Sequence, residues 1–348
     1  MDSKELRARI ERGEPLVDID LSQGALAGAD LSGGIFERVR FRGAELSGAD
    51  LRESTFTGCD FSGARMVGAQ MTHTVVHDGD LREAVLTKAN LVAVQIIQSQ
   101  LASADLRGAQ MLQAALIRVD LTGAVLAETD MERASVLESN TTGIDLSNAR
   151  LRQTTLYQSD LRKAKLGGAK FDLAVLIGSK LAGMDLRGSD FALTQLTGAD
   201  LAGCDLSEAN LTQCNFKDAV LEGAKLDKAK AANALFVGAK LQRASLRGTQ
   251  LFQALWVDAN LTQADCTGAQ MQQCILHRAQ CQAARFADAD LTYADFSYAD
   301  VSAAHFTGAT VTRAKFHQTK EQGTIGKGRG ALGDDPELAE AERWRPKY

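Results

Sequence analysis

The sequence predicts an all-β repeat fold, on three observations. Residues whose numbers leave a remainder of one on division by five are large and apolar at 57 of the 61 positions from Leu16 to Phe316. The residue two places before each of these is Ala, Gly, Ser, Thr or Cys at 54 of the 61 positions. No proline occurs between Pro15 and Pro336, which indicates that nearly all backbone amides in this stretch donate hydrogen bonds, as they do in a sheet.

A period of five residues matches neither the period of an α-helix, about 3.6 residues, nor the two-residue period of a plain strand. The units "ADLSG" (29–33), "ADLRE" (49–53) and "ADLAG" (199–203) resemble the pentapeptide-repeat family, over residues 14–318. The resemblance implies a right-handed quadrilateral β-helix, in which each unit forms one side of a square turn. The central residue and the small residue two before it would point inward. Four units per turn then predict about 15 coils in one domain.

The two ends of such a coil expose unpaired backbone groups and invite association unless they are covered. Asp2 and Glu5 have capping-box spacing, and Gly13 can end a helix. A short capping helix is therefore predicted over residues 3–12, within an N-terminal segment of residues 1–13.

Residues 319–348 are predicted to form a tail outside the repeats. Its first part is rich in glycine and expected to be flexible, and a short helix is expected to start at Asp335 and Pro336. Leu338, Ala341 and Trp344 could be buried by this helix. The sequence leaves open whether the tail is disordered, docked on its own rod or held by a partner.

Composition excludes several classes of protein. The formal net charge of −5 is too small to indicate a class of partner. No apolar run resembles a signal peptide or approaches the roughly 18 residues of a membrane span. A cytoplasmic location is therefore predicted, with secretion that needs no leader left open, and no direct contact with membrane or nucleic acid is expected.

The sequence predicts no enzyme and no cofactor. All six cysteines occupy inward positions, where they are expected to act as small apolar residues. His77 and His277 would be ten turns apart, roughly 48 Å at sheet spacing, so no metal site is predicted. The aspartates before central residues recur as part of the repeat, with no pocket to raise their pKa. The unbroken period of five also excludes a six-residue acyltransferase solenoid.

One side of the predicted square is unlike the other three. Residues 20 apart stack on the same side, and 14 large apolar residues point outward on the side of Phe236 and Trp256, against seven on the other three sides together. A general preference of valine and isoleucine for strands does not explain this restriction. We expect this side to bind a partner. The residues predicted to do so are Ile97, Ile117, Leu137, Tyr157, Val175, Ile177, Leu235, Val237, Leu255, Val257 and Ile275.

The function favoured by these patterns is that of a non-enzymatic interaction scaffold, which presents the apolar side to an unknown protein partner or to a second copy in a homodimer. The resemblance also implies an alternative, a DNA-mimicking regulator of DNA gyrase, as in the dimeric Qnr and MfpA proteins. Here the sequence departs from a continuous acidic face, because Arg40 and Lys180 alternate with Asp20 and Asp160. A third hypothesis follows from residues 9–33, which look like segments of accessory proteins of bacterial type VI secretion.

Overall fold

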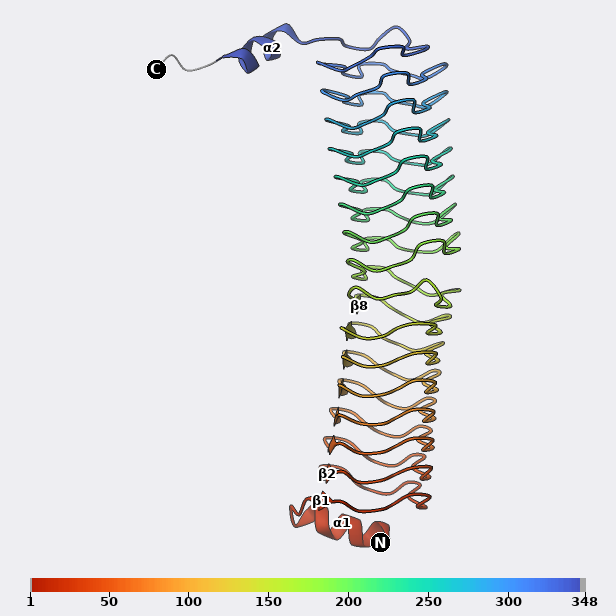
Figure 1. Ribbon diagram of the computed structural model, residues 1–348, viewed down its shortest axis with the longest axis vertical. Coiled ribbons are helices and arrows are strands. Elements are labelled where there is room, and N and C mark those ends of the chain that lie inside the picture. Colours follow the sequence, from red (N-terminus) through yellow and green to blue (C-terminus); the bar gives the residue numbers. More distant parts are fainter. Residues whose placement is uncertain (1, 345–348) are drawn as a thin grey trace. The chain divides into compact units, whose positions relative to one another are not determined.

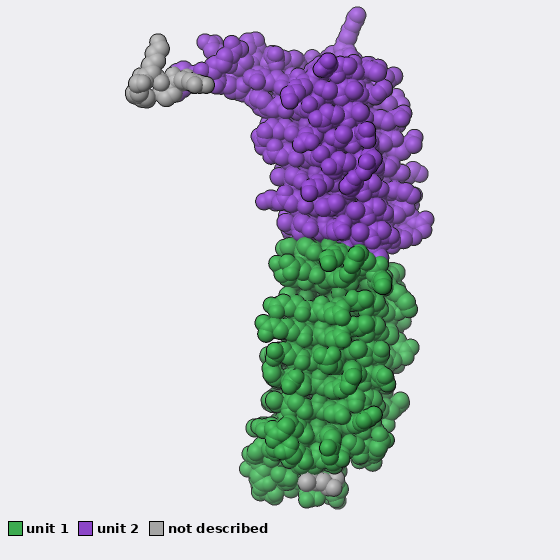
Figure 2. All heavy atoms as spheres, viewed as in Figure 1, with its two compact units in different colours: residues 1–180 green, residues 181–348 purple. Residues whose placement is uncertain are grey.

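The computed structural model describes residues 2–344. The chain divides into two compact units, residues 1–180 and residues 181–348, which are coloured separately in Figure 2. Each unit has a buried apolar core of its own. None of the helices in the described part of the chain is both long enough and apolar enough to cross a lipid bilayer.

The first unit is a parallel β-solenoid, which confirms the predicted fold class. Its eight strands follow one another in chain order in one sheet, each parallel to the next (Figure 1). The register pairs Phe36 with Phe56 and Leu116 with Val136, so one turn contains 20 residues. The strands are β1 (Leu16–Val17), β2 (Ile35–Glu37), β3 (Thr55–Thr57), β4 (Val75–His77), β5 (Gln95–Ile97), β6 (Ala115–Ile117), β7 (Ser135–Leu137) and β8 (Thr155–Leu156).

The remaining sides of each turn are joined by single-residue parallel bridges, such as the one between Asp30 and Asp50. Between sides the chain bends at a residue that lies two places after the central one. This residue takes a left-handed conformation, with φ of 58° at Glu53 and 64° at Gly48. Glycine adopts this conformation without strain, whereas a glutamate side chain adopts it at a small cost. One such bend follows every five residues, which makes the turn four-sided.

The predicted count of about 15 coils does not match this structure. The named strands form a sheet of eight, which corresponds to about seven turns. Extended strands end with β8 at Leu156, and the chain divides into its two units after Lys180. The count from sequence assumed one uninterrupted rod, and apolar periodicity alone contains no signal for where the extended segments end.

The core of the first unit consists of stacked side chains that follow the 20-residue period. The rings of Phe36 and Phe56 stack with centroids 4.6 Å apart, and those of Phe41 and Phe61 stack at 4.7 Å. Buried hydroxyls at the small inward positions are satisfied, as Thr74 Oγ1 donates to the Leu51 carbonyl at 2.7 Å. Stacked rings and hydrogen-bonded hydroxyls together fill the narrow interior.

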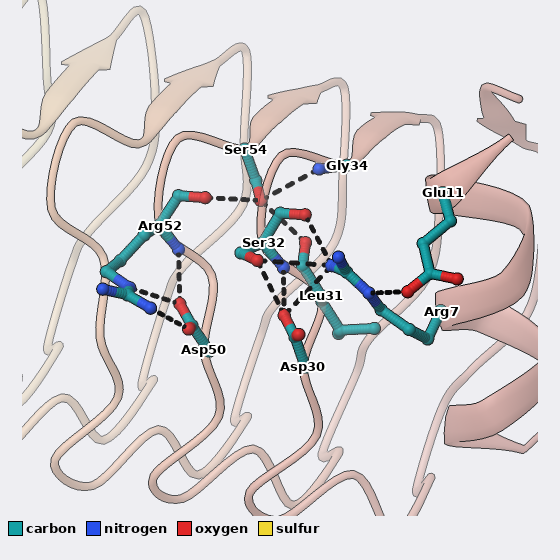
Figure 3. A network of polar contacts seen from close by, with 9 residues as sticks. All are labelled: Arg7, Glu11, Asp30, Leu31, Ser32, Gly34, Asp50, Arg52 and Ser54. Atoms are coloured by element: carbon teal, nitrogen blue, oxygen red, sulfur yellow. Dashed lines mark hydrogen bonds and ion pairs between the residues drawn. The ribbon is translucent and has the colours of Figure 1, made fainter. Parts of the chain in front are cut away.

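Helix α1 (Ser3–Glu11) covers the first turn, within the span predicted for the capping helix. The Asp2 carboxylate caps it by accepting from the Glu5 amide at 2.8 Å, and Leu6 is fully buried. Arg7 ties the helix to the solenoid, because its Nη1 donates to Asp30 Oδ1 and to the Ser32 carbonyl, each at 3.1 Å (Figure 3). The apolar end of the coil is thereby closed by one side chain and fixed by one ion pair.

The second unit repeats the 20-residue spacing through single-residue parallel bridges, from Asp185 with Asp205 to His305 with Ile325. Its interior contains a run of stacked rings. Phe236 lies between Phe216, at a centroid distance of 4.9 Å, and Trp256, at 4.0 Å. The bridge pattern extends into the predicted flexible tail as far as Leu332, which pairs with Lys315. The domain boundary at residues 318 and 319 stays a prediction.

Helix α2 (Pro336–Arg343) begins where the sequence places a helix start, after the capping side chain of Asp335. The expectation that this helix buries its apolar residues is wrong. Leu338 is 42% exposed and Trp344 is 73% exposed, while Ala339 is buried instead. The reason is that α2 is held against the solenoid by polar groups near its two ends, so its apolar side chains do not have to face the core.

Candidate interaction surface

In the first unit, the outward side chains of the strand-bearing side form a ladder of apolar residues. Ile97 of β5 lies opposite Ile117 of β6, and Ile117 lies opposite Leu137 of β7. Neighbouring strands in a sheet are roughly 4.8 Å apart, so these side chains touch along the stack. We call the following set the first apolar patch, and all of its members are at least partly exposed: Ile97, Ile117, Leu137, Tyr157, Val175 and Ile177.

In the second unit, one side of the turn carries two outward apolar residues in each of two turns. Leu235 bridges to Leu255, and Leu255 bridges to Ile275. These residues flank the buried Phe236 and Trp256, so they sit over the run of stacked rings in the core of this unit. We call the following partly exposed set the second apolar patch: Leu235, Val237, Leu255, Val257 and Ile275.

One edge of each patch carries a pair of opposite charges. Beside the first patch, Arg118 Nε donates to Glu138 Oε2 at 2.8 Å. Beside the second patch, Arg278 donates from Nε to Asp258 Oδ1 at 2.7 Å and from Nη2 to Asp258 Oδ2 at 2.8 Å. The opposite edge of the second patch carries amides, where Gln253 donates to Gln273 at 2.8 Å. A partner could therefore cover the second patch without burying an unpaired charge of its rim. On the corresponding edge of the first patch, Arg133 Nε donates to an amide oxygen, that of Gln153, at 2.9 Å.

Five of the repeated aspartates are paired with an arginine two residues further along the chain. The five pairs of this kind have N–O distances between 2.5 and 2.6 Å: Asp50 with Arg52, Asp80 with Arg82, Asp105 with Arg107, Asp160 with Arg162, and Asp185 with Arg187. The hydrogen bond from the arginine lowers the pKa of Asp160 and of Asp185 to about 2 in each case. These carboxylates are ionised partners of arginine, not proton donors poised for catalysis.

These pairs predict a pH dependence for the folded state. A pKa below the usual aspartate value of about 3.9 means that the interaction stabilises the fold above that pH and is lost as the pH falls toward 2. In a carbon-detected NMR titration we expect Asp185 to titrate near pH 2 in the native protein. With Arg187→Ala its midpoint should rise toward 4, while Asp160 keeps its low midpoint as the internal control. An unchanged Asp185 midpoint in that variant would contradict the pairing.

The cysteines and histidines do not form a reactive site. Burial raises the pKa of the Cys59 thiol to about 11 and that of Cys214 to about 12, so these thiols stay protonated at neutral pH. All six cysteines are buried and unbonded to one another. Across residues 2–344 no group of three or more histidine, cysteine or acidic side chains is arranged to hold a metal ion.

The structure adds one feature to this side that the sequence analysis missed, the seat of α2. The His317 imidazole is buried, and its Nδ1 accepts from the Asp335 amide at 3.1 Å. Glu342 accepts from Gln318 Nε2 at 2.7 Å and from the Tyr298 hydroxyl. A signal was present in the spacing of His277 and His317, which are 40 residues or two turns apart and therefore lie on the side of the second apolar patch. Nothing in the sequence indicated where the tail would return.

A cavity of about 310 Å³ lies between α2 and the solenoid. Its wall is mixed, with Leu332 and Leu338 contributing apolar surface and His277 contributing a polar edge. His277 Nε2 lies 3.1 Å from Asp295 Oδ2. Because His277 belongs to the same turn side as Ile275, the cavity adjoins the end of the second apolar patch.

Comparison with known proteins identifies the repeat. A family model described as pentapeptide repeats (8 copies) matches residues 16–72, 99–135 and 139–320 in overlapping segments. No curated protein matches the chain.

Several solved structures are similar to the chain. HetL, a pentapeptide-repeat protein involved in heterocyst differentiation regulation in the cyanobacterium Nostoc, is 24% identical, with a TM-score of 0.26, over 76% of this chain and 96% of HetL. A trypsin-treated form of the plasmid-mediated fluoroquinolone resistance protein QnrB1 is 20% identical, with a TM-score of 0.28, over 61% of this chain and 91% of that one. Scores this low carry no argument about function. Because the family model matches more than half of the 348 residues, the chain belongs to the pentapeptide-repeat family.

Proposed function

We propose that the protein is a non-catalytic scaffold that binds a protein partner, or a second copy of itself, through its apolar side. The observation that carries this proposal is the gathering of partly exposed apolar side chains on one side in each unit, beside an edge whose charges are paired. A pentapeptide-repeat solenoid is typically a scaffold for protein interactions, which supports the same conclusion.

The energetics also favour a contact surface. Removing apolar surface from water contributes about 25 cal/mol per Å², and aliphatic ladders such as Ile97, Ile117 and Leu137 gain this contribution only when a partner covers them. The paired rim charges would keep their partners in the complex, so binding would not leave them desolvated and unpaired. A polar surface of the same extent would gain much less from being covered.

The alternative of a DNA-mimicking regulator of DNA gyrase is weaker. A mimic of duplex DNA needs a continuous field of unpaired negative charge facing a basic groove. In this chain five of the aspartates that could supply that field are paired with arginines two residues further on, as Asp80 is with Arg82 at 2.5 Å, so the negative field is interrupted. A gyrase supercoiling assay with the purified protein distinguishes the two functions, because the scaffold proposal expects no inhibition. The role in type VI secretion rests on residues 9–33 alone, and association with a spike protein would support it.

The scaffold proposal is tested by replacing apolar residues of each patch with charged ones. The first-patch variant is Ile117→Glu with Leu137→Lys, and the second-patch variant is Val237→Asp with Val257→Lys. Opposite charges one turn apart attract each other, so neither variant places like charges side by side. We expect at least one variant to lose its co-purifying partner, or its dimer mass by light scattering, by tenfold or more while keeping its circular dichroism spectrum.

Matched controls lie in the same turns on another side. Leu112→Glu controls for the first-patch variant, and Phe252→Asp controls for the second, where Phe252 is 41% exposed. These controls are expected to keep every interaction of the native chain. If both patch variants retain the same partners and the same mass as the native chain, the apolar side is not the binding surface.

A further inference from the structure

We propose that the second apolar patch binds an amphipathic helix of a partner protein, laid along the stack of turns beside α2. This inference rests on the proposed scaffold function and adds the kind of partner. It follows from the size of the patch, from helix α2 on the same side of this unit, and from the cavity between α2 and the solenoid.

The size of the patch excludes a second copy as its main occupant. The ladder from Leu235 through Leu255 to Ile275 covers three turns, roughly 10 Å at sheet spacing, and the side is about as wide. A stable dimer buries about 800 Å² on each partner, several times the area of such a patch. A helix is roughly 10 Å across, and its pitch of about 5.4 Å is close to the distance between turns, so it can set one apolar side chain against each turn.

The chain itself shows that this side of the second unit accepts a helix. Helix α2 is held on this side by the Asp335 backbone amide, which donates to His317 Nδ1. It is also held by the Glu342 carboxylate, which accepts from Gln318 and Tyr298. These contacts are polar and lie next to the apolar patch without covering it. The second apolar patch therefore stays exposed beside α2.

The cavity under α2 gives the proposed helix an anchor point. It adjoins Ile275 through His277, and Leu332 and Leu338 form its apolar wall. At about 310 Å³ it is at the small end of ligand pockets and has room for one large side chain. A buried aromatic or aliphatic anchor of this kind is what typically dominates the affinity of an interface.

The side chains at the edges of the second apolar patch determine which residues a bound helix can carry on either side of its apolar face. One edge carries the hydrogen-bonded amides of Gln253 and Gln273, and the other carries the Asp258–Arg278 pair. Neither edge presents an unpaired charge to attract a strongly acidic or basic peptide. We therefore expect a helix with three or four apolar residues at intervals of three and four, and neutral or mixed flanks.

The test uses a displayed library of random 16-residue peptides selected on the full-length chain. Binders are then compared on the variant Val237→Asp with Val257→Lys and on the control Phe252→Asp. We expect the enriched peptides to carry apolar residues at intervals of three and four, and to gain helical circular dichroism on binding. They should bind the patch variant at least tenfold more weakly and bind the control as tightly as the native chain.

The proposed helix would be overturned by no enrichment at all, by enrichment of peptides with alternating apolar residues that bind as strands, or by equal affinity for the patch variant. Two further results would assign the patch to another occupant. A dimer that this variant dissociates would assign the patch to a second copy. Peptide binding that occurs only in Glu342→Ala would show that α2 itself covers it. Strand-like peptides that still depend on the patch would refute the helix and leave the scaffold function standing, so the two failures are distinguishable.

Discussion

Replacing Trp256 with alanine is expected to destabilise the second unit by about 3–5 kcal/mol, the usual loss for a large aromatic side chain removed from a core. Trp256 is fully buried and stacks on Phe236 with centroids 4.0 Å apart and an interplanar angle of 7°. A narrow solenoid has little freedom to collapse around the cavity, because each turn is fixed by hydrogen bonds to the turns on both sides. Chemical unfolding followed by far-UV circular dichroism measures the loss.

The matched control is Trp256→Phe. Phenylalanine keeps a ring in the stack and removes the indole N–H, which is buried and has no hydrogen-bond partner of normal geometry in the described part of the chain. We expect this variant to lose less than half as much stability as the alanine variant. If Trp256→Ala unfolds at the same denaturant concentration as the native chain, the stacked column does not support the second unit.

Deleting one whole turn, residues 91–110, is expected to leave a folded solenoid with one strand fewer. The register pairs residues 20 apart, so after this deletion β4 (Val75–His77) would face β6 (Ala115–Ile117) with every inward residue still inward. Solenoid stability is approximately a sum over repeats and their interfaces, so the loss should be limited to the share of one turn. Thermal unfolding by circular dichroism, together with light scattering, measures the outcome.

The contrasting deletion removes two residues fewer, residues 93–110. Met111 would then occupy the corner position of Ala93, where φ is 54°, and Leu116 would occupy that of Gln98, where φ is 51°. Large apolar side chains would move to the outside and polar ones to the core, at a cost of several kcal/mol for each displaced turn. We expect this variant to aggregate or to unfold far below the 20-residue deletion. Equal stability of the two would refute the role of the 20-residue register.

The one-sided apolar surface could be predicted from the sequence, because the 20-residue period that stacks the core residues also determines which outward residues share a side. Once 20 residues make a turn, Ile97 and Ile117 must share a side, and the structure places them opposite each other in β5 and β6. The same reasoning could not find the pairing of the aspartates. Whether Asp160 is free or bound to Arg162 depends on side-chain rotamers, and this pairing is what weakens the gyrase alternative.

The sequence by itself determined the parallel solenoid, its 20-residue turn, the capping helix at the N-terminus and the side on which apolar residues gather. These properties follow from a pattern repeated every five residues, so each five-residue unit specifies the same inward and outward positions. Only the tertiary structure decided where extended strands end, how Glu342 and His317 seat α2, and that a cavity opens between α2 and the solenoid. Those features depend on single, non-repeated contacts between distant residues, and a periodic pattern contains no information about a contact that occurs once.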